Sequence, residues 1–366
     1  MRVGIAVYGD LGQVSGGYLY DRKLIEHLEA RGDEVIVFSQ PKRAYPLRLT
    51  ENFNLSFWRR LASADLDVLL QDELNHASLV FGNRWLRRSI DAPIVTIVHH
   101  LRAKEPRSRY SKCASRFLER LYLQATDARI YNSQTTRQSV EHLAGRRPCV
   151  VARPSGRRFG PSASAEMISE RATSEGPLRV LYVGNLIPRK RLHLLIEGLG
   201  RAQCREWRLD VVGDLSANRS YATTVRRHIR RLSDPTRVSL HGQLTDEELR
   251  RRLSGSHVLA VPSAYEGYGI VYVEAMGHGL PVIASPNGGV CDIVQDGENG
   301  RFAETAAGIA DAVDEWHFNR DCLADMGRAA IAYYRSTPTW AETGRRIASF
   351  LDRLPAASSS QPVASS

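Results

Sequence analysis

Two glutamates lie eight positions apart in the segment PSAYEGYGIVYVEAMGHGLPVIASPNGGVCDIVQDGENG, which covers residues 262–300. A strand-like apolar run ends near Val261, and a helical pattern begins near Gly269. Glu266 is therefore expected just before a helix N-terminus, and Glu274 two turns inside the helix. Eight positions correspond to about 80° of helical phase. One carboxylate can thus face the mouth of a ligand site while the other reaches deeper.

The residues between the two glutamates suit an anionic ligand. Gly267 and Gly269 permit close approach of the backbone to a ligand. The amides around Tyr268–Val271, at a helix start, can bind an oxyanion or a phosphate. Each glutamate alone is typical of an exposed helix carboxylate. The pair, with Gly-Tyr-Gly between them and the GLPVIAS strand behind, favours a functional site.

A basic cluster lies in VGNLIPRKRLHLLIEGL, residues 183–199, where a strand ends and a helix begins. Arg189, Lys190 and Arg191 occupy the loop-to-helix junction. Cations there can stabilise a diphosphate leaving group as its bond to another group breaks. The simpler interpretation is a solvated basic cluster.

The N-terminal half offers two weaker signals. Gly16 and Gly17 precede a helix in GDLGQVSGGYLYDRKL, but a plain tight turn explains them equally well, since G-x-G-x-x-G is absent. The strand Ile94–Val98 ends in His99-His100. A single histidine at a strand end is more often structural than functional.

The elements that must position these residues alternate along the chain. Strand-like runs are separated by amphipathic stretches, which predicts βαβ units and parallel sheets with helices on both faces. The expected strands are 2–8, 34–38, 68–71, 94–98, 128–132, 149–152, 178–183, 209–212, 238–241, 258–261 and 281–284. Ligands of such sheets bind at the carboxyl ends of the strands, and a cleft between two such domains is the default site.

The alternation stops once, which divides the chain. Residues 1–155 form the expected N-terminal domain on the acceptor side, and 178–336 the expected C-terminal domain. The stretch 156–177 is rich in Pro, Ser, Gly and charge and is expected to be a linker. Residues 337–354 are expected to form a helix that packs back toward the N-terminal domain, and 355–366 a disordered tail.

Composition narrows the protein class. The chain has 366 residues, a formal charge of +10 and five scattered cysteines without C-x-x-C spacing. These features indicate a two-domain α/β protein with no zinc or redox motif. Residues 1–155 carry 24 lysines and arginines against 16 aspartates and glutamates, so this half attracts anions. No signal peptide or membrane-spanning run is recognised, which favours a cytoplasmic location.

The segment 262–300 resembles the E-x7-E signature of retaining glycosyltransferases of family 4, which have the GT-B architecture of two Rossmann-like doubly wound domains facing a central cleft. The resemblance extends over residues 1 to about 350. It implies that Glu266 faces the donor sugar together with Gly267 and Tyr268, and that Glu274 binds the ribose. It assigns the diphosphate to Arg189, Lys190, Gly16, Gly17, Gly269 and Ile270. Lys190, Glu266 and His99 are the implied catalytic residues, with His99 aligning slightly better than His100.

Two positions depart from the family pattern. Asn185 occupies the place of an arginine that binds the diphosphate, and Arg189 or Arg191 is expected to supply that charge. Asp292 stands where a glutamate is frequent and keeps the charge.

The resemblance implies transfer of a hexose-type sugar from a UDP- or GDP-sugar to a hydroxyl acceptor, with retention and without a metal or other cofactor. Cell-envelope polysaccharide, glycolipid and natural-product glycosides are the product classes considered. A non-hydrolysing sugar-nucleotide 2-epimerase and an inactive nucleotide-sugar-binding module are the alternatives.

A dense basic stretch in the N-terminal half has two interpretations. It comprises Arg102, Lys104, Arg107, Arg109, Lys112, Arg116 and Arg120, opposed by Glu105 and Glu119, and Phe81, Trp85 and Ile90 lie among arginines nearby. One interpretation is peripheral contact with an anionic membrane, at its inner face, by an enzyme with a lipid-linked or phosphorylated acceptor. The other is an ordinary amphipathic helix packed on a sheet. Nucleic acid is not expected as a partner, since the stretch lacks the aromatic pattern of a stacking platform.

Overall fold

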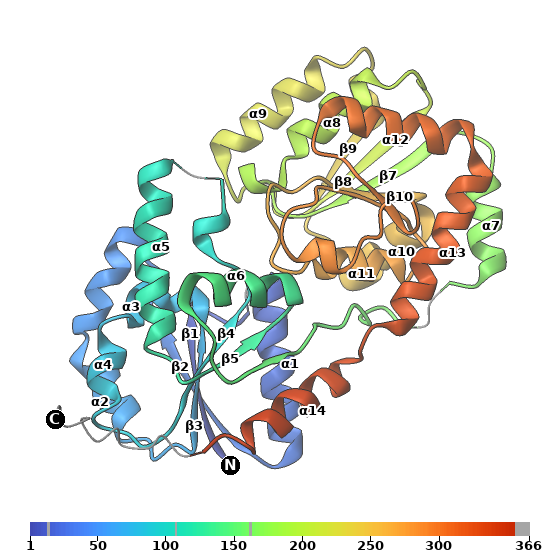
Figure 1. Cartoon of the computed structure of the whole chain (residues 1–366). Helices are drawn as coiled ribbons and strands as arrows, with labels where there is room; N and C mark the ends of the chain where they lie inside the picture. Colours follow the sequence, from blue (N-terminus) through green and yellow to red (C-terminus); the bar gives the residue numbers. More distant parts are fainter. Residues whose placement is uncertain (13–14, 107, 161–162, 356–366) are drawn as a thin grey trace. The chain divides into compact units, whose positions relative to one another are not determined.

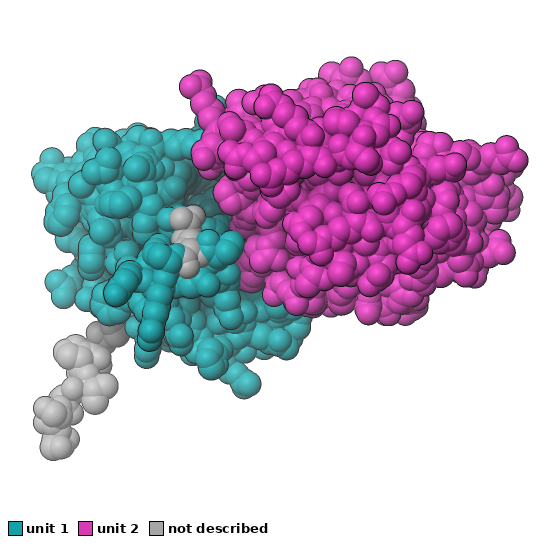
Figure 2. All heavy atoms as spheres, turned by 90° about the horizontal axis from the view of Figure 1, so that it is seen from above, with its two compact units in different colours: residues 1–154, 338–366 teal, residues 155–337 magenta. Residues whose placement is uncertain are grey.

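The computed structural model describes residues 1–12, 15–106, 108–160 and 163–355. The chain divides into two compact units (Figure 2). Unit 1 consists of residues 1–154 together with the C-terminal residues from Pro338 onward, and unit 2 of residues 155–337. The tail expected at 355–366 lies, except for Pro355, outside the described residues, as does Arg107 of the basic stretch.

Unit 1 contains a six-stranded parallel sheet with the strand order β2-β1-β3-β4-β5-β6 (Figure 1). Its strands are β1 (Arg2–Tyr8), β2 (Glu34–Gln40), β3 (Val68–Asp72), β4 (Ile94–Val98), β5 (Ala128–Tyr131) and β6 (Cys149–Val151). Its helices are α1 (Gly16–Arg31), α2 (Leu55–Ala62), α3 (His76–Leu79), α4 (Gly82–Leu86), α5 (Arg109–Gln124), α6 (Gln134–Ala144) and α14 (Trp340–Leu351), with 3-10 turns η1 (Tyr45–Phe53), η2 (Glu73–Asn75) and η3 (Arg102–Lys104).

Unit 2 contains a second six-stranded parallel sheet, with the order β12-β11-β10-β7-β8-β9. Its strands are β7 (Leu178–Val183), β8 (Trp207–Val212), β9 (Val238–Gly242), β10 (Val258–Val261), β11 (Val282–Ala284) and β12 (Gly300–Phe302). Its helices are α7 (Ala165–Thr173), α8 (Leu192–Arg201), α9 (Arg219–Arg230), α10 (Asp246–Gly255), α11 (Ile270–Met276), α12 (Ala306–Phe318) and α13 (Arg320–Ser336), with 3-10 turns η4 (Pro188–Lys190), η5 (Pro235–Arg237) and η6 (Gly289–Asp292).

The strand order fixes where each sheet can bind a ligand. In unit 2 the chain begins at β7, winds outward through β8 and β9, and returns to the other side of β7 at β10. This is the order of the dinucleotide-binding doubly wound fold, whose ligands bind where the order reverses. In unit 1 the reversal lies between β1 and β3. The loops after β7 and β10, and those after β1 and β3, are therefore the places to look for sites.

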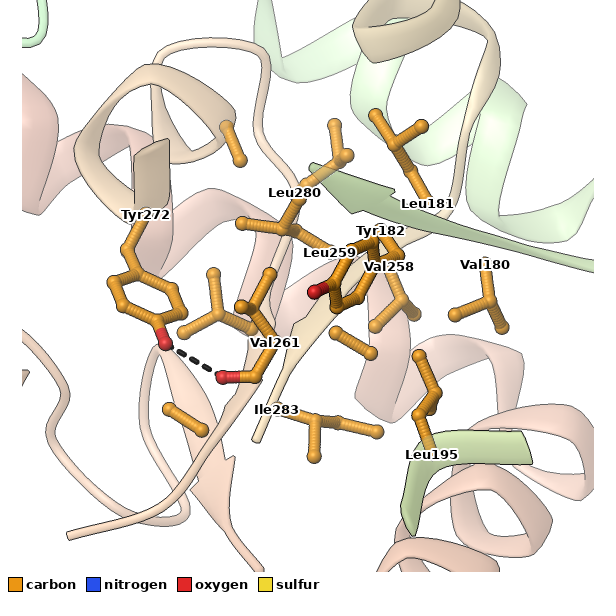
Figure 3. Close-up of a cluster of buried hydrophobic side chains, with 14 of the residues drawn as sticks. Val180, Leu181, Tyr182, Leu195, Val258, Leu259, Val261, Tyr272, Leu280 and Ile283 are labelled. Atoms are coloured by element: carbon orange, nitrogen blue, oxygen red, sulfur yellow. Dashed lines mark hydrogen bonds between the residues drawn. The ribbon is translucent and has the colours of Figure 1, made fainter. Parts of the chain in front are cut away.

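A hydrophobic core supports the reversal point of unit 2. Tyr182 of β7, Leu259 of β10 and Ile283 of β11 are fully buried between the helices (Figure 3). The Tyr272 hydroxyl of α11 donates a hydrogen bond of 2.6 Å to the carbonyl of Val261 (Figure 3). This bond ties α11 to the end of β10 and holds the intervening loop between two fixed points.

Part of the segment expected as a linker is helical. The Ser164 hydroxyl accepts a hydrogen bond from the amide of Met167 and caps α7, and Ile168 is buried beside Ile331. The few apolar residues of the segment stabilise a helix because they face one side. The content of Pro, Ser and charged residues does not reveal this arrangement.

None of the helices in the part of the chain that the structure describes has the length and hydrophobicity needed to cross a membrane.

Candidate functional site

Backbone hydrogen bonds fix Glu266 in the loop that follows β10. Its amide donates to the carbonyl of Asn287 at 3.1 Å, and its carbonyl accepts from the amide of Gly289 at 2.8 Å. A Cβ added at Gly288 would lie 2.0 Å from the Glu266 carbonyl oxygen, and one at Gly289 would lie 2.0 Å from that of Gly267. The two loops can approach this closely only because both positions are glycine.

The Glu266 side chain is buried between two cations. Its Oε1 lies 2.5 Å from Nζ of Lys190 and accepts a hydrogen bond of 2.6 Å from the Ser263 hydroxyl. Its Oε2 lies 3.4 Å from Nη1 of Arg189. Lys190 ends η4 after β7, so the residues come from the two strands that flank the reversal of strand order. The structure thus brings together a glutamate and a lysine that are far apart in the sequence.

These partners set the charge of Glu266. Burial alone would raise the pKa of its carboxyl group, but Lys190 and then Arg189 outweigh burial and lower that pKa to about 2. Burial lowers the pKa of Lys190, and Glu266 opposes that change. At neutral pH Glu266 is a carboxylate, which accepts hydrogen bonds and has no proton to donate.

Arg189 supplies the second positive charge of this site. Its Nη1 also donates to the carbonyl of Tyr265 at 2.6 Å, and its own carbonyl accepts from the amide of Ala264 at 2.8 Å. Arg191 instead adopts a left-handed backbone, with φ of 50°, at the start of α8. Among the described residues, Arg191 makes no ion pair with Glu266, so Arg189 is the better candidate for the missing arginine.

Asn185 has a structural role at the end of β7. Its Oδ1 accepts a hydrogen bond of 3.1 Å from the amide of Asp214, in the loop after β8. Gly213, with φ of 143°, packs so closely on Gly184 that a Cβ would lie 2.3 Å from the Gly184 carbonyl oxygen. Asn185 therefore joins two neighbouring loops.

Glu274 lies on α11 and is also buried. It is the fifth residue of a short helix, about one turn from the start. The expected two turns were wrong, because the eight positions between the two glutamates include the loop from Glu266 to Gly269, which is not helical. Arg158 Nη1 lies 3.7 Å from its Oε1. Burial raises the pKa of Glu274 to about 7, although Arg158 lowers it.

Arg158 is a site residue that the sequence did not reveal. Its Nε donates to Oδ2 of Asp246 at 3.0 Å, and Nη2 pairs with the other carboxylate oxygen. Its guanidinium lies 5.1 Å from the centre of the Phe159 ring. The expected linker contained Arg158, and no local pattern links it to Glu274.

The glycine-rich turn contributes backbone rather than side chains. Gly269 adopts a left-handed φ of 98° at the cap of α11. The Tyr268 ring belongs to the hydrophobic core of unit 2. A sugar contact at Gly267 and Tyr268, and a phosphate contact at Gly269 and Ile270, would therefore come mainly from the main chain. These four assignments stay predictions.

In unit 1 the two neighbouring histidines differ. His99 is buried, and its Nε2 lies 3.1 Å from Oδ1 of Asp21 and 4.0 Å from Oδ1 of Asp72. A Cβ at Gly17 would lie 3.2 Å from Cδ2 of the His99 ring, so the glycine makes room for the imidazole. His100 is half-buried, and its Nε2 lies 3.1 Å from Oε1 of Glu105.

Other polar residues at the strand ends are structural. Asp127 Oδ2 accepts a hydrogen bond of 2.9 Å from the amide of Ile94, and Nδ2 of Asn132 donates one of 2.7 Å to the carbonyl of His99. The Ser133 hydroxyl caps α6 by accepting from the amide of Thr136.

Two buried groups in unit 1 have the residue types of metal ligands. They are Asp21, Asp72 and His99, and Glu73, His76 and Glu119, whose ligand atoms lie within 4.8 Å of one another in each group. Mixed carboxylate and imidazole sets suit divalent transition metals. Direct contacts within each group, such as that between His99 and Asp21, explain both groups equally well without a metal ion.

Most of unit 2 matches a known protein family. Residues 164–333 match the family described as glycosyl transferases group 1.

Two curated relatives share moderate identity with the chain. One is a GDP-mannose-dependent alpha-(1-6)-phosphatidylinositol monomannoside mannosyltransferase of Mycobacterium tuberculosis, 29% identical over 53% of this chain. That match spans about half, 52%, of the relative's own length. The other is a D-inositol 3-phosphate glycosyltransferase of Nocardia farcinica, 27% identical over 92% of this chain and 84% of the relative.

Solved structures share the fold of the whole chain. Sucrose-phosphate synthase of Thermosynechococcus elongatus superimposes with a TM-score of 0.81 at 20% identity, over 96% of this chain and 98% of that chain. HepE of Anabaena, solved in complex with UDP-glucose, superimposes with a TM-score of 0.75 at 20% identity, over 97% and 100% of the two chains. The prediction of two Rossmann-like domains is confirmed, and so is the resemblance to family 4-type glycosyltransferases of the GT-B fold.

Proposed function

We propose that the chain, whose residues 164–333 match the family of group 1 glycosyl transferases, transfers a hexose-type sugar from a UDP- or GDP-sugar to a hydroxyl acceptor, with retention of configuration. One observation carries the proposal. Glu266 is held as a buried carboxylate against Lys190 and Arg189, at the point where the strand order of unit 2 reverses. This is where a nucleotide binds in a doubly wound sheet.

The proposed reaction breaks the bond between the sugar and the diphosphate. The acceptor oxygen forms the new bond on the same face of the sugar, and its proton passes to the departing diphosphate. Lys190 and Arg189 would stabilise the negative charge that develops on the diphosphate. A resident metal has no part in the proposal, because these side chains supply the positive charge.

The two glutamates would orient the donor. Glu266, with its pKa lowered to about 2, stays ionised and would accept hydrogen bonds from sugar hydroxyls. Glu274 would accept hydrogen bonds from the ribose hydroxyls. The roles predicted for Gly16, Gly17 and His99 stay predictions.

The relatives support an acceptor that carries a phosphate. One is described as acting on a phosphatidylinositol monomannoside and another on D-inositol 3-phosphate. For the donor, HepE was solved with UDP-glucose. We therefore favour a phosphorylated or lipid-linked acceptor. The charge of +8 carried by residues 1–155, from 24 basic and 16 acidic residues, suits such a substrate.

Helix α5 supports the additional proposal that unit 1 contacts an anionic membrane surface. Its outward face carries exposed Arg109, Lys112, Arg116 and Arg120 beside the exposed rings of Tyr110 and Phe117. Glu119, which opposes this charge in the sequence, is fully buried, and burial raises its pKa to about 8. Basic residues interleaved with exposed aromatics bind anionic interfaces. We place the enzyme at the cytoplasmic face of the membrane.

The variant Glu266→Gln tests the reaction. The side chain keeps its size but loses its charge, so we expect turnover of UDP- or GDP-sugar to fall by about 100-fold or more. Glu266 neutralises Lys190 in the unliganded protein, so binding of free UDP or GDP should persist or strengthen in this variant. Thermal-shift titration measures that binding, and turnover by the parent protein should persist in EDTA.

Glu298→Gln is the matched control, since Glu298 is an exposed glutamate of the same unit. It should retain parental turnover. Parental turnover by Glu266→Gln would overturn the proposal. Consumption of nucleotide sugar that needs no acceptor would identify an epimerase, and nucleotide-sugar binding without any turnover by the parent would identify a binding module.

Vesicle co-sedimentation tests the membrane contact. The protein should pellet with vesicles containing phosphatidylglycerol at low salt, less at high salt, and not with purely zwitterionic vesicles. Replacing Lys112, Arg116 and Arg120 by glutamine should reduce pelleting. Equal pelleting with both vesicle types, or none with either, would contradict the proposal.

A further inference from the structure

Three arginines of unit 2 lie at the amino end of its sheet. Arg171 is in the last turn of α7, Arg179 is the second residue of β7, and Arg320 is the first residue of α13. The candidate donor site follows the other end of β7, and the six residues of this strand span about 20 Å. The three arginines are therefore remote from Lys190 and Glu266.

His257, which directly precedes β10, connects two of these arginines. Its Nδ1 accepts a hydrogen bond of 2.9 Å from the amide of Arg179, so Nε2 carries the ring proton and donates to the carbonyl of Arg171 at 2.9 Å. The guanidinium groups also have neighbouring partners. Nη1 of Arg171 donates to the carbonyl of Ser254 at 3.3 Å, and Nε of Arg179 donates to that of Gly255 at 2.5 Å. Because these carbonyls are adjacent in the chain, the two guanidinium groups lie close together.

Arg320 reaches the same place from α13. Its Nη2 donates a hydrogen bond of 3.1 Å to the carbonyl of Gly176, three residues before Arg179, and its Nη1 is buried without a hydrogen-bond partner. Among the described residues, none accepts a hydrogen bond from either terminal nitrogen of Arg179. A Cβ added at Gly176 would meet nothing within 4 Å, so there is open space beside this turn. The arginines therefore offer several unused donors next to room for a ligand.

These three positive charges have no carboxylate partner. Among the described residues, no carboxylate oxygen lies within 4.0 Å of any of the three guanidinium groups. Burial and then the charge of Arg179 lower the pKa of Arg171 to about 10, and burial also lowers the pKa of Arg179 and of Arg320. Glu206, whose side chain is exposed, opposes that change at Arg320. Charges withdrawn from water are ordinarily paired in proteins, so this cluster favours an anionic ligand.

We propose that Arg171, Arg179 and Arg320 form a binding site for a phosphate group, separate from the donor site. A guanidinium group matches two oxygens of a phosphate, and the two terminal nitrogens of Arg179 are available for that contact. Arg320 supplies a further donor, and Arg171, held by its carbonyl partners, supplies positive charge. A cation or an uncharged sugar does not fit this cluster. The inference does not rest on the proposed function, because it concerns the opposite end of the sheet.

Arginine-selective labelling of the full chain tests the site without any variant. The protein reacts with p-hydroxyphenylglyoxal, and peptide mass spectrometry measures the rate at each arginine. Inorganic phosphate, with the ionic strength held constant by sodium chloride, should slow the labelling of Arg179 along a saturation curve. The rate should fall by about tenfold when phosphate reaches about ten times its dissociation constant. Arg226, an exposed arginine of the same unit, should react at the same rate throughout.

Variants show whether the arginines act together. Arg320→Gln removes a charge-assisted donor, so the phosphate concentration that half-protects Arg179 should rise by about tenfold. Arg226→Gln removes the same charge elsewhere in unit 2 and should leave that concentration unchanged. Lys190→Ala should also leave it unchanged, because Lys190 belongs to the donor site. An unchanged value in Arg320→Gln, or a tenfold rise in Lys190→Ala, would contradict the shared site. Labelling of the parent protein remains decisive if Arg320→Gln does not fold.

Two further probes identify the source of the phosphate. Glycerol 3-phosphate is a soluble ester, and vesicles of phosphatidylcholine with phosphatidic acid present the same group on a lipid. Protection of Arg179 by inorganic phosphate and glycerol 3-phosphate would assign a soluble ligand, and protection by these vesicles alone would assign a lipid headgroup. Either result supports the site. No protection by any of the three probes, or equal protection by sodium chloride alone, would overturn the inference.

Discussion

At the scale of single residues, the candidate site separates two glutamates by their electrostatic surroundings. Glu266 faces two cations and has a pKa of about 2, whereas Glu274 faces one more distant guanidinium and has a pKa of about 7. Both are buried, so the difference comes from the partners and not from exposure. Glu266 keeps its charge throughout the physiological range, and Glu274 changes its charge within that range.

The first prediction is a pH dependence of nucleotide binding. Ribose hydroxyls bind best to an ionised Glu274, so the affinity for UDP should weaken by about tenfold from pH 8 to pH 6. Isothermal titration measures it. The stability of the unliganded protein has the opposite pH dependence. Folding raises the pKa of Glu274, so the contribution of this group to stability is full below about pH 4.5 and is lost as pH rises through about 7.

Two variants isolate the effect of Glu274 on nucleotide binding. Glu274→Gln should show only the pH dependence of UDP itself. Arg158→Ala should move the midpoint of the pH dependence of UDP affinity to higher pH, because Arg158 lowers the pKa of Glu274. An unchanged profile in Glu274→Gln would show that this carboxyl group does not control binding.

At the scale of elements, loops rather than long helices build the site. Helix α11 has only seven residues, and the loop before it is held by the Gly288-Gly289 turn. The carbonyls of Glu266 and Gly267 lie where side chains of residues 288 and 289 would otherwise be. Close packing of the two loops therefore requires glycine at both positions.

Gly289→Ala should destabilise unit 2 and displace Glu266. The added Cβ would meet the Gly267 carbonyl oxygen at 2.0 Å, and relief requires movement of the loop. Overpacking of this kind costs about 1–3 kcal/mol. Thermal unfolding and turnover should both decline. Gly255→Ala is the control, since a Cβ there meets nothing within 4 Å, and it should leave stability the same or slightly higher. Equal behaviour of the two variants would refute the packing argument.

At the scale of the whole molecule, the chain returns to its first unit. Residues from Pro338 onward belong to unit 1, where Ile347, Phe350 and Leu351 of α14 pack with Leu24 and Leu28 of α1. Close contact with α1 is possible because Gly344 faces the His27 ring. The hydrophobic core of unit 1 is therefore complete only when α14 is in place.

Leu351→Ala should destabilise unit 1 selectively. Leu351 is 2% exposed, and removal of its side chain leaves a cavity that costs about 2–5 kcal/mol. Hydrogen exchange resolved by segment should show faster exchange in α1 and β1, with unit 2 unchanged. Leu47→Ala, at a leucine of unit 1 that is 54% exposed, should have little effect. Equal acceleration in both units would contradict this assignment of α14.

The sequence by itself determined the two doubly wound halves and most of the chemistry-bearing residue types. Strand and helix periodicity is local, and so are the glycines next to Glu266 and His99, so both can be read along the chain. The tertiary structure decided the partners. Lys190 meets Glu266 across 76 positions, Asp21 meets His99 across 78, and Arg158 reaches Glu274 from a segment without regular pattern. These contacts depend on strand order and loop path, which join distant segments and leave no periodic trace in either one. The pKa values that distinguish Glu266 and Glu274 follow from those partners and from burial, and therefore from the fold.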